Sequence, residues 1–176
     1  MTEETGRLHL LVERVIAAKE QLDTEGALDD GARTVRPRPP LSFERLVQAR
    51  ALFESRGLAM PRDYERVLRA HDGVDHLWRD AGGASFSLFG HRELLLAQRR
   101  AADVIIATAA SGEEVVLAAG PTELPVVVVR NAQGRAIARF PSVTAWLEWI
   151  LAEMTAERSS APRSPGVRSP SAHRSP

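Results

Sequence analysis

Apolar side chains recur every three or four residues in four segments of the chain, a spacing that places them on one face of a helix. The four segments are residues 7–22, 43–56, 61–73 and 143–156. Ser42 precedes the second segment as a helix N-cap, and Gly57 follows it as a terminator. The pattern therefore predicts four amphipathic helices, of which the second and third pack as neighbours because a short turn joins them.

The third of these segments is marked as a helix at both ends. Pro61 suits the first helical turn, where its missing N–H has no helical partner, and Gly73 suits the left-handed conformation that closes a helix. Between them, Tyr64, Val67 and Leu68 form one apolar stripe. The sequence predicts a short helix that docks on a hydrophobic core.

The segment after this helix, from Asp72 to Arg79, is predicted to be a loop. It contains Trp78 at a place where turn chemistry favours small polar residues. A large aromatic side chain there either covers the core or contacts a partner, because tryptophan is suited to both environments.

The second half of the chain changes from helical spacing to short runs of β-branched and alternating residues. These runs predict five strands and one helix, with the strands at 84–89, 104–108, 115–119, 126–130 and 136–140 and the helix at 91–102. Connections between the last four strands are too short for parallel crossovers, so these strands form an antiparallel meander. The predicted fold class is α+β, a mainly antiparallel sheet packed against N-terminal helices and a C-terminal helix.

Two segments lack a pattern of buried positions. Residues 23–41 contain a proline-rich stretch that favours extended geometry, and we predict a linker that is semi-rigid near its end. Its Pro-Arg-Pro-Pro run is also a short candidate ligand for a proline-recognition module. Residues 158–176 contain three Arg-Ser-Pro units and are expected to be disordered. The predicted organisation is an N-terminal helix (1–22), the linker (23–41), an α+β domain (42–157) and the tail (158–176).

Composition narrows the class of protein. The chain has 176 residues, 44% of them hydrophobic, and no cysteine, which excludes disulfides and thiolate metal sites. No apolar run approaches the roughly 20 residues of a membrane span, and no secretory leader is recognisable, so the expected location is the cytoplasm. The net charge is zero, but residues 159–176 carry three arginines and no acid, which leaves three net negative charges on the remainder.

This charge balance argues against a nucleic-acid surface made by bulk positive charge, and no specific nucleic-acid binding is expected. The arginines of the tail can supply weak, salt-sensitive contacts to phosphates or acidic proteins, but a solvated tail is the simpler interpretation. Serines that precede prolines in the tail are also potential phosphorylation sites, and phosphates there would reverse the charge of the tail.

Motifs for nucleophilic catalysis and phosphate binding are missing from the sequence. There is no Gly-x-Ser-x-Gly, and the Gly82-Gly83 pair lacks the lysine and spacing of a phosphate loop. One set of residues has the chemistry of a divalent metal site, namely His71, Asp72, Asp75 and His76. The alternative is structural, because His71 continues the apolar stripe and Asp72 can accept hydrogen bonds from turn amides. We expect no catalytic residue, no metal and no cofactor.

Five short sequences occur in an order that resembles a known family. They are Met60-Pro61-x-x-Tyr64, His71-Asp72-Gly73, Phe86-Ser-Leu-Phe-Gly90, Glu93-Leu94-Leu95 and the final helix from Phe140 through Trp146-Leu147-Glu148. In this order and spacing, residues 42–153 resemble the SUKH superfamily, in the branch that contains fungal cell-wall-synthesis regulators and bacterial toxin-immunity proteins. The chain departs from the family pattern at Met60, in the short segment 74–83, and in its first helix and tail.

The resemblance implies an α+β fold without enzymatic activity and, in bacteria, a protein that binds and neutralises a toxin, often a nuclease. The first hypothesis is therefore a non-enzymatic immunity protein that binds a toxin domain through its sheet surface and the Asp72–Arg79 segment. The partner-binding residues predicted on this basis are Asp72, Asp75, His76, Trp78 and Arg79. The alternatives are an intracellular scaffold or regulator that uses the linker and tail, and a metal-dependent enzyme built on the four candidate ligands.

Overall fold

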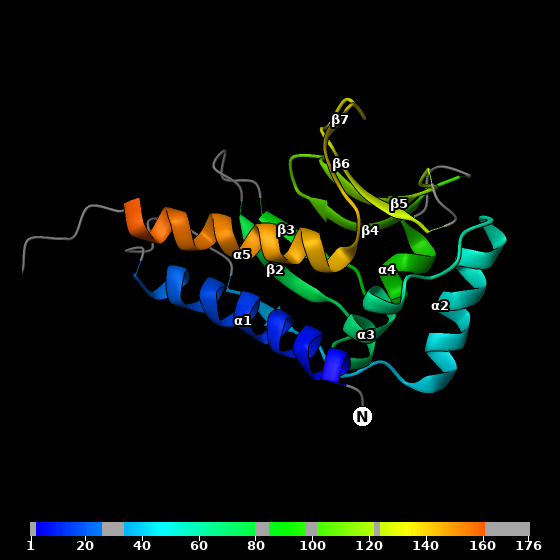
Figure 1. Cartoon of the computed structure of the whole chain (residues 1–176), viewed down its shortest axis with the longest axis horizontal. Coiled ribbons are helices and arrows are strands. Elements are labelled where there is room, and N and C mark those ends of the chain that lie inside the picture. The colour runs from blue at the N-terminus through cyan, green and yellow to red at the C-terminus, as the bar shows by residue number, and fades with distance from the viewer. Residues whose placement is uncertain (1–2, 26–33, 80–84, 98–101, 122–123, 161–176) are drawn as a thin grey trace, which may run out of the picture.

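A computed structural model describes residues 3–25, 34–79, 85–97, 102–121 and 124–160. Within these residues the chain forms five helices and one seven-stranded antiparallel sheet (Figure 1). The predicted α+β fold class is confirmed. None of the described helices is long and apolar enough to cross a membrane.

The sheet follows the order of the chain without a crossover. The helices are α1 (Glu3–Glu25), α2 (Phe43–Ser55), α3 (Arg62–Ala70), α4 (His91–Leu96) and α5 (Val143–Ser160). The strands are β1 (Arg36–Pro37), β2 (Val74–Arg79), β3 (Ser85–Leu88), β4 (Val104–Ala109), β5 (Glu114–Ala118), β6 (Val126–Arg130) and β7 (Ala136–Phe140). Each strand pairs antiparallel with the next, so the predicted meander is confirmed and extends from β1 to β7.

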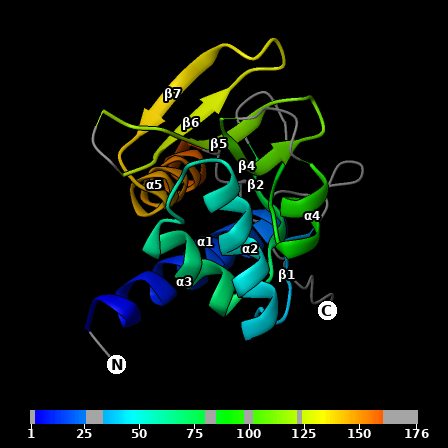
Figure 2. The ribbon, with the colours of Figure 1, turned by 90° about the vertical axis from the view of Figure 1, so that its right-hand side faces the viewer.

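Helices α1 and α5 lie side by side, and Figure 2 views α5 along its axis beside strands β5 to β7. Helix α1 also contacts α3 and β2, whereas α5 contacts β6 and β7. Their inward positions, such as Val12, Val15, Trp146 and Ile150, are fully buried in one hydrophobic core. The N-terminal helix is therefore part of the same packed unit as the sheet.

The ends of α3 differ from the prediction. Pro61 is the N-cap rather than the first helical residue, and the helix ends at Ala70 with His71 extended (φ −144°, ψ 129°). Gly73 has a positive φ of 88° but does not terminate the helix. The helix stops early because the Asp72 N–H donates to the carbonyl of Pro39 (2.8 Å), which draws the chain onto the proline-rich segment.

The prediction of a loop from Asp72 to Arg79 is wrong, because residues 74–79 form strand β2. This strand lies inside the sheet between β1 and β3, whose backbones supply its hydrogen-bond partners. Its register shifts between Val74 and Trp78, and this irregularity accommodates the polar residues that resemble a turn in the sequence. The end of the predicted linker is not a free spacer either, since it forms β1 at the edge of the sheet, where proline is tolerated.

The remaining elements lie close to their predicted positions. Strands β6 and β7 have the predicted ends. Strand β4 begins as predicted and ends one residue later, β5 begins and ends one residue earlier, and β3 ends one residue earlier than predicted. The helix expected over 91–102 ends at Leu96, and α5 continues to Ser160, where the Ser159 hydroxyl donates to the Thr155 carbonyl (2.9 Å). The predicted linker begins three residues too early, because α1 continues to Glu25. Residues 26–33, the Gly82-Gly83 pair and the tail from residue 161 lie outside the described residues.

Two glycines bring the start of β2 against the start of α4. A Cβ on Gly73 would lie 2.6 Å from the backbone nitrogen of Gly90, and a Cβ on Gly90 would overlap the backbone carbonyl of Asp72. This close approach lets the Asp72 carboxylate accept a hydrogen bond from the His91 N–H (2.6 Å) in the first turn of α4. Neither position has room for a side chain.

We predict that Gly90→Ala destabilises the protein by about 3 kcal/mol or more, because the new methyl group must displace backbone rather than a flexible side chain. The matched control is Gly57→Ala, where φ is 70° but no atom lies within 4 Å. The control substitution should lower the free energy of unfolding by only about 1–2 kcal/mol, because alanine is strained in the left-handed conformation. Urea denaturation measures both values, and equal losses for the two variants would contradict the close-contact explanation.

Candidate functional site

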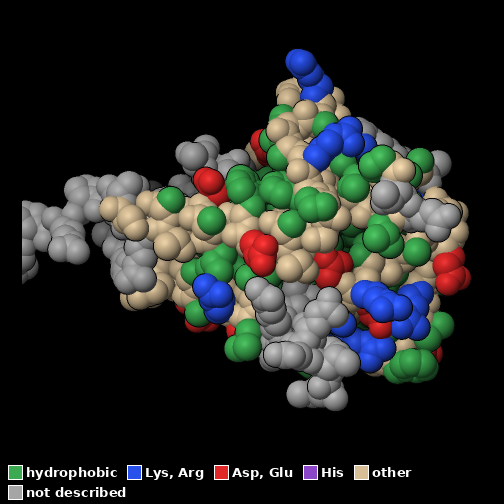
Figure 3. Space-filling view, in the orientation of Figure 1, with side chains coloured by type: hydrophobic (Ala, Val, Ile, Leu, Met, Phe, Trp, Pro, Cys, Tyr) green, Lys and Arg blue, Asp and Glu red, His purple; other side chains and the backbone are tan. Residues whose placement is uncertain are grey.

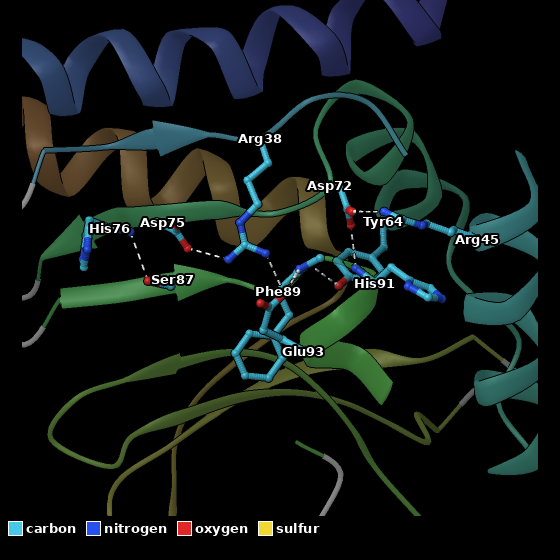
Figure 4. Close-up of polar contacts among 11 residues, drawn as sticks. Arg38, Arg45, Tyr64, Asp72, Asp75, His76, Ser87, Phe89, His91 and Glu93 are labelled. Atoms are coloured by element: carbon cyan, nitrogen blue, oxygen red, sulfur yellow. Dashed lines mark hydrogen bonds and ion pairs between the residues drawn. The ribbon is translucent and has the colours of Figure 1, made fainter. Parts of the chain in front are cut away.

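A cluster of three charged side chains joins β1, β2 and α4 (Figure 4). Arg38 follows β1 directly and donates from Nη2 to Asp75 on β2 (2.6 Å) and from Nη1 to Glu93 in the first turn of α4 (2.7 Å). We call these three residues the Arg38 cluster. All three side chains are half-buried, so their hydrogen bonds are only partly screened by solvent.

Arg38 and Glu93 are held in their charged states. Hydrogen bonds to Asp75 and Glu93 raise the pKa of the Arg38 guanidinium, which stays protonated. Burial alone would raise the pKa of Glu93, but hydrogen bonds from Arg38 and from backbone N–H groups outweigh burial and hold this pKa below its usual value. Groups in this state stabilise the fold and are poorly suited to transferring protons near neutral pH.

Asp72 occupies a neighbouring polar site between α2 and α4. Besides accepting from the His91 N–H, its carboxylate lies 3.7 Å from the Arg45 guanidinium on α2. The His91 ring in turn lies 2.7 Å from the side-chain oxygen of Gln48. These contacts fix α2 and α4 to each other and to the start of β2.

Tyr64 supports this site from the core. Its side chain is fully buried, and its hydroxyl donates to the Phe89 carbonyl (3.1 Å). Burial raises the pKa of Tyr64, and the nearby charges of Asp72 and Glu93 raise it further. The residue is therefore a neutral hydrogen-bond donor that connects α3 to the segment before α4.

His76 lies within the irregular part of β2 and has a φ of 56°. Among the described residues, it is the only one other than glycine with a positive φ, a conformation that costs an L-residue about 1–2 kcal/mol. Its N–H donates to the Ser87 hydroxyl (3.0 Å, Figure 4), and its ring Nδ1 lies 3.2 Å from the Ser85 hydroxyl. These contacts to β3 hold the strained backbone in place.

A row of polar residues crosses the sheet from this point. Residues opposite each other in an antiparallel pair project to the same face. The register places Ser87 opposite Thr108, Thr108 opposite Glu114, and Glu114 opposite Arg130. All four are half-buried, whereas the alternate residues Phe86 and Leu88 face the core. The Arg130 Nη1 lies 2.7 Å from Asp103 but makes no aligned hydrogen bond, so this contact is an ion pair.

The predicted partner-binding residues have different environments in the structure. Asp72, Asp75 and His76 are half-buried and engaged in the contacts above. Trp78 is 6% exposed, stacks on Phe86 (ring centroids 4.8 Å apart) and meets the edge of Trp149 on α5 (5.0 Å). Arg79 ends β2, and its side chain lies outside the described part of the structure. Of the two roles open to Trp78, the structure places it in the core.

The four candidate metal ligands are not assembled into one site. The His71 ring nitrogens lie 2.8 Å from a Glu13 oxygen and 3.2 Å from the Arg38 carbonyl oxygen. Asp75 instead binds the Arg38 guanidinium, and His76 contacts two serines of β3. Across the described ranges, no group of three or more His, Cys, Asp or Glu residues is placed to hold a metal ion. His71 instead ties α1 to the end of α3.

Sequence reasoning missed Arg38 and Glu93, which are central to the site. Arg38 lies between prolines in a segment assigned as a linker, and its two partners are 37 and 55 residues away in the chain. A signal for Glu93 was present, because a glutamate three residues after a helix N-cap commonly bonds the N-cap N–H. The Glu93 carboxylate accepts from the Gly90 N–H in this way (3.2 Å).

Comparison of the sequence with protein-family models finds no matching family, and comparison with curated proteins finds no significant match. The SUKH resemblance therefore rests on the order of the short sequences quoted above. The structure adds a reason for two of these sequences, because Gly73 and Gly90 form the close contact between β2 and α4.

We predict that Trp78→Ala lowers the free energy of unfolding by about 3–5 kcal/mol, because it empties a buried site between β3 and α5. Leu124→Ala, at a position that is 70% exposed, should change it by less than about 0.5 kcal/mol. Denaturation of both variants provides the measurement. A stable Trp78→Ala protein would contradict the aromatic packing described here.

We also predict an acid-dependent contribution from Glu93. Because its folded pKa lies below the unfolded value of about 4.3, its stabilising effect is complete above that pH and is lost as the pH falls toward the folded pKa. Glu93→Gln should cost about 1 kcal/mol at neutral pH and make stability fall less steeply below about pH 5. The control is Glu153→Gln on the exposed side of α5, which should retain the acid sensitivity of the parent chain.

Proposed function

We propose that this chain is a non-enzymatic protein-binding domain, an immunity protein that neutralises a cognate toxin by binding it directly. The observation that carries the proposal is a group of exposed apolar side chains on helices α2 and α4. These are Phe43 and Val47 on α2 and Leu95 and Leu96 on α4. Together they are called the α2–α4 apolar patch below.

The exposure of this patch is unusual for side chains of its size. Phe43 is 73% exposed and Leu96 is 75% exposed. Among the described residues there are seven exposed large hydrophobic side chains, and four of them belong to these two neighbouring helices. Large apolar side chains exposed to this degree are candidates for contact with a partner protein, and each of the two helices carries a pair of them.

The polar contacts beneath the patch make it rigid. Asp72 binds the first turn of α4 and lies near Arg45 of α2, while the Arg38 cluster ties α4 to β1 and β2. A surface held in this way loses little conformational entropy when a partner binds, which favours affinity. On this proposal, Asp72 and Asp75 act at the border of the contact, whereas His76 contacts β3 and Trp78 packs between β3 and α5.

Charge also favours a partner of a particular kind. Residues 1–158 carry three net negative charges, which complement a basic protein surface such as that of a nuclease and increase the rate of association. The nuclease activity of the toxin is inferred from the SUKH resemblance alone. The α2–α4 apolar patch and the net negative charge of residues 1–158 do not depend on that resemblance.

The contacts of the candidate residues favour recognition over catalysis. The carboxylates of Asp75 and Glu93 are bound by Arg38, and that of Asp72 is bound by a backbone amide. A scaffold that recruits proteins through the proline-rich segment is the second candidate. It is less well supported, because Arg38 and Pro39 are bonded to Gly73 and Asp72 through their backbones at the edge of the sheet.

The test is capture of partners by the purified full chain, followed by expression of each captured protein alone and together with this chain. We expect one captured protein to be toxic alone and to be neutralised on co-expression. Phe43→Asp and Leu96→Asp should each abolish capture and rescue, because a charge replaces an apolar contact and is desolvated on binding.

Leu124→Asp and Ile137→Asp are the matched controls, since these side chains are 70% and 62% exposed but lie outside the α2–α4 apolar patch. Both control variants should retain rescue. The immunity proposal fails if no captured protein is toxic, and the assignment of the surface fails if the controls lose rescue as completely as the patch variants.

A further inference from the structure

A second surface feature lies on a different pair of helices. A groove with a volume of about 970 Å³ runs between α1 and α5. Its lining includes the apolar side chains of Leu10, Leu11, Leu151 and Ala152. Leu10 is 61% exposed although it is a large hydrophobic residue, and it lies outside the buried stripe of α1. The proposed toxin-binding surface does not account for this groove.

The two sides of the groove carry opposite charges. Arg66 of α3 is among the lining residues. Arg14 lines the groove from α1 and Glu148 lines it from α5, and both of these side chains are exposed. Within the part of the chain that the structure describes, neither residue takes part in an ion pair or a hydrogen bond through its side chain. Figure 3 shows acidic and basic side chains among hydrophobic ones on the face that carries α5.

The direction of the two helices makes this charge arrangement self-complementary. Helices α1 and α5 run side by side in the same direction (Figure 1). A two-fold axis parallel to them would therefore place α1 of each copy over α5 of the other, again in the same direction. The α1 side of each copy, which carries Arg14 and Leu10, would then lie over the α5 side of the other, which carries Glu148 and Leu151. A two-fold contact of this kind is the commonest form of protein self-association.

We propose that the groove between α1 and α5 binds the same groove of a second copy, so that the protein forms a two-fold dimer. The occupant is a second copy because a groove with Arg14 on its α1 side and Glu148 on its α5 side complements itself when each α1 lies over the opposing α5. The α2–α4 apolar patch lies on other helices and stays free in each copy. The dimer proposal rests on a different surface from the proposed toxin binding, so each of the two proposals can be disproved without the other.

The experiment measures the mass of the full chain by analytical ultracentrifugation over a range of concentrations. We expect a reversible dimer. Arg14→Glu and Glu148→Arg should each raise the dissociation constant at least tenfold, because each places like charges opposite one another in two symmetry-related pairs. The double variant Arg14→Glu with Glu148→Arg should restore most of the affinity, because it re-forms both pairs with the signs exchanged.

Leu10→Asp should also dissociate the dimer, whereas Glu153→Arg, an exposed charge reversal on α5 that does not line the groove, should leave it unchanged. Thermal denaturation of every variant separates loss of the dimer from loss of the fold. A parent chain that is monomeric at all concentrations overturns the proposal. A dimer that is unaffected by Leu10→Asp, or a double variant as weak as the single ones, overturns this groove as the interface.

Discussion

The contact between Gly73 and Gly90 is the constraint on which the arrangement of the site depends. The two backbones approach more closely than any side chain permits, so the residue before β2 and the N-cap of α4 are fixed relative to each other. This placement lets the Asp72 carboxylate reach the His91 N–H and brings Glu93 within reach of Arg38. A bulkier residue at either glycine would separate α4 from β2 and disconnect the charged groups.

The charged side chains near this contact hold α4 in position against the sheet. Arg38 reaches Asp75 and Glu93 at once, and so it connects the edge of the sheet to α4. Because α4 is only six residues long, its orientation depends on contacts of this kind rather than on intrinsic helix stability. The same contacts determine which way Leu95 and Leu96 project. The buried polar network and the exposed apolar patch are therefore linked through one short helix.

The parts of the fold that could be predicted from the sequence are those governed by local pattern. The β-branched runs and short turns determine β6 and β7, and the spacing of Val143, Trp146 and Ile150 determines α5. Strand β2 could not be recognised, because its irregular register breaks the alternation on which strand prediction relies. Pairings such as Arg38 with Glu93 leave no periodic signal at all, since tertiary packing alone brings these residues together. Gly73 was recognised as a position that needs glycine, but the reason is the contact with Gly90.

Segments outside the region that resembles the SUKH superfamily are integral to the fold. That region spans residues 42–153, yet α1 contributes Val12 and Val15 to the common core, and its Glu13 lies 2.8 Å from the His71 ring at the end of α3. The segment before α2 supplies Arg38, without which the carboxylates of Asp75 and Glu93 would face each other with no cation between them. Such a pair is destabilising when it is partly buried, since like charges repel more strongly in a low dielectric. The shared region therefore depends on Arg38 for a stable charge arrangement, and a form of this chain that begins at α2 would lose both its groove and the charge that holds α4.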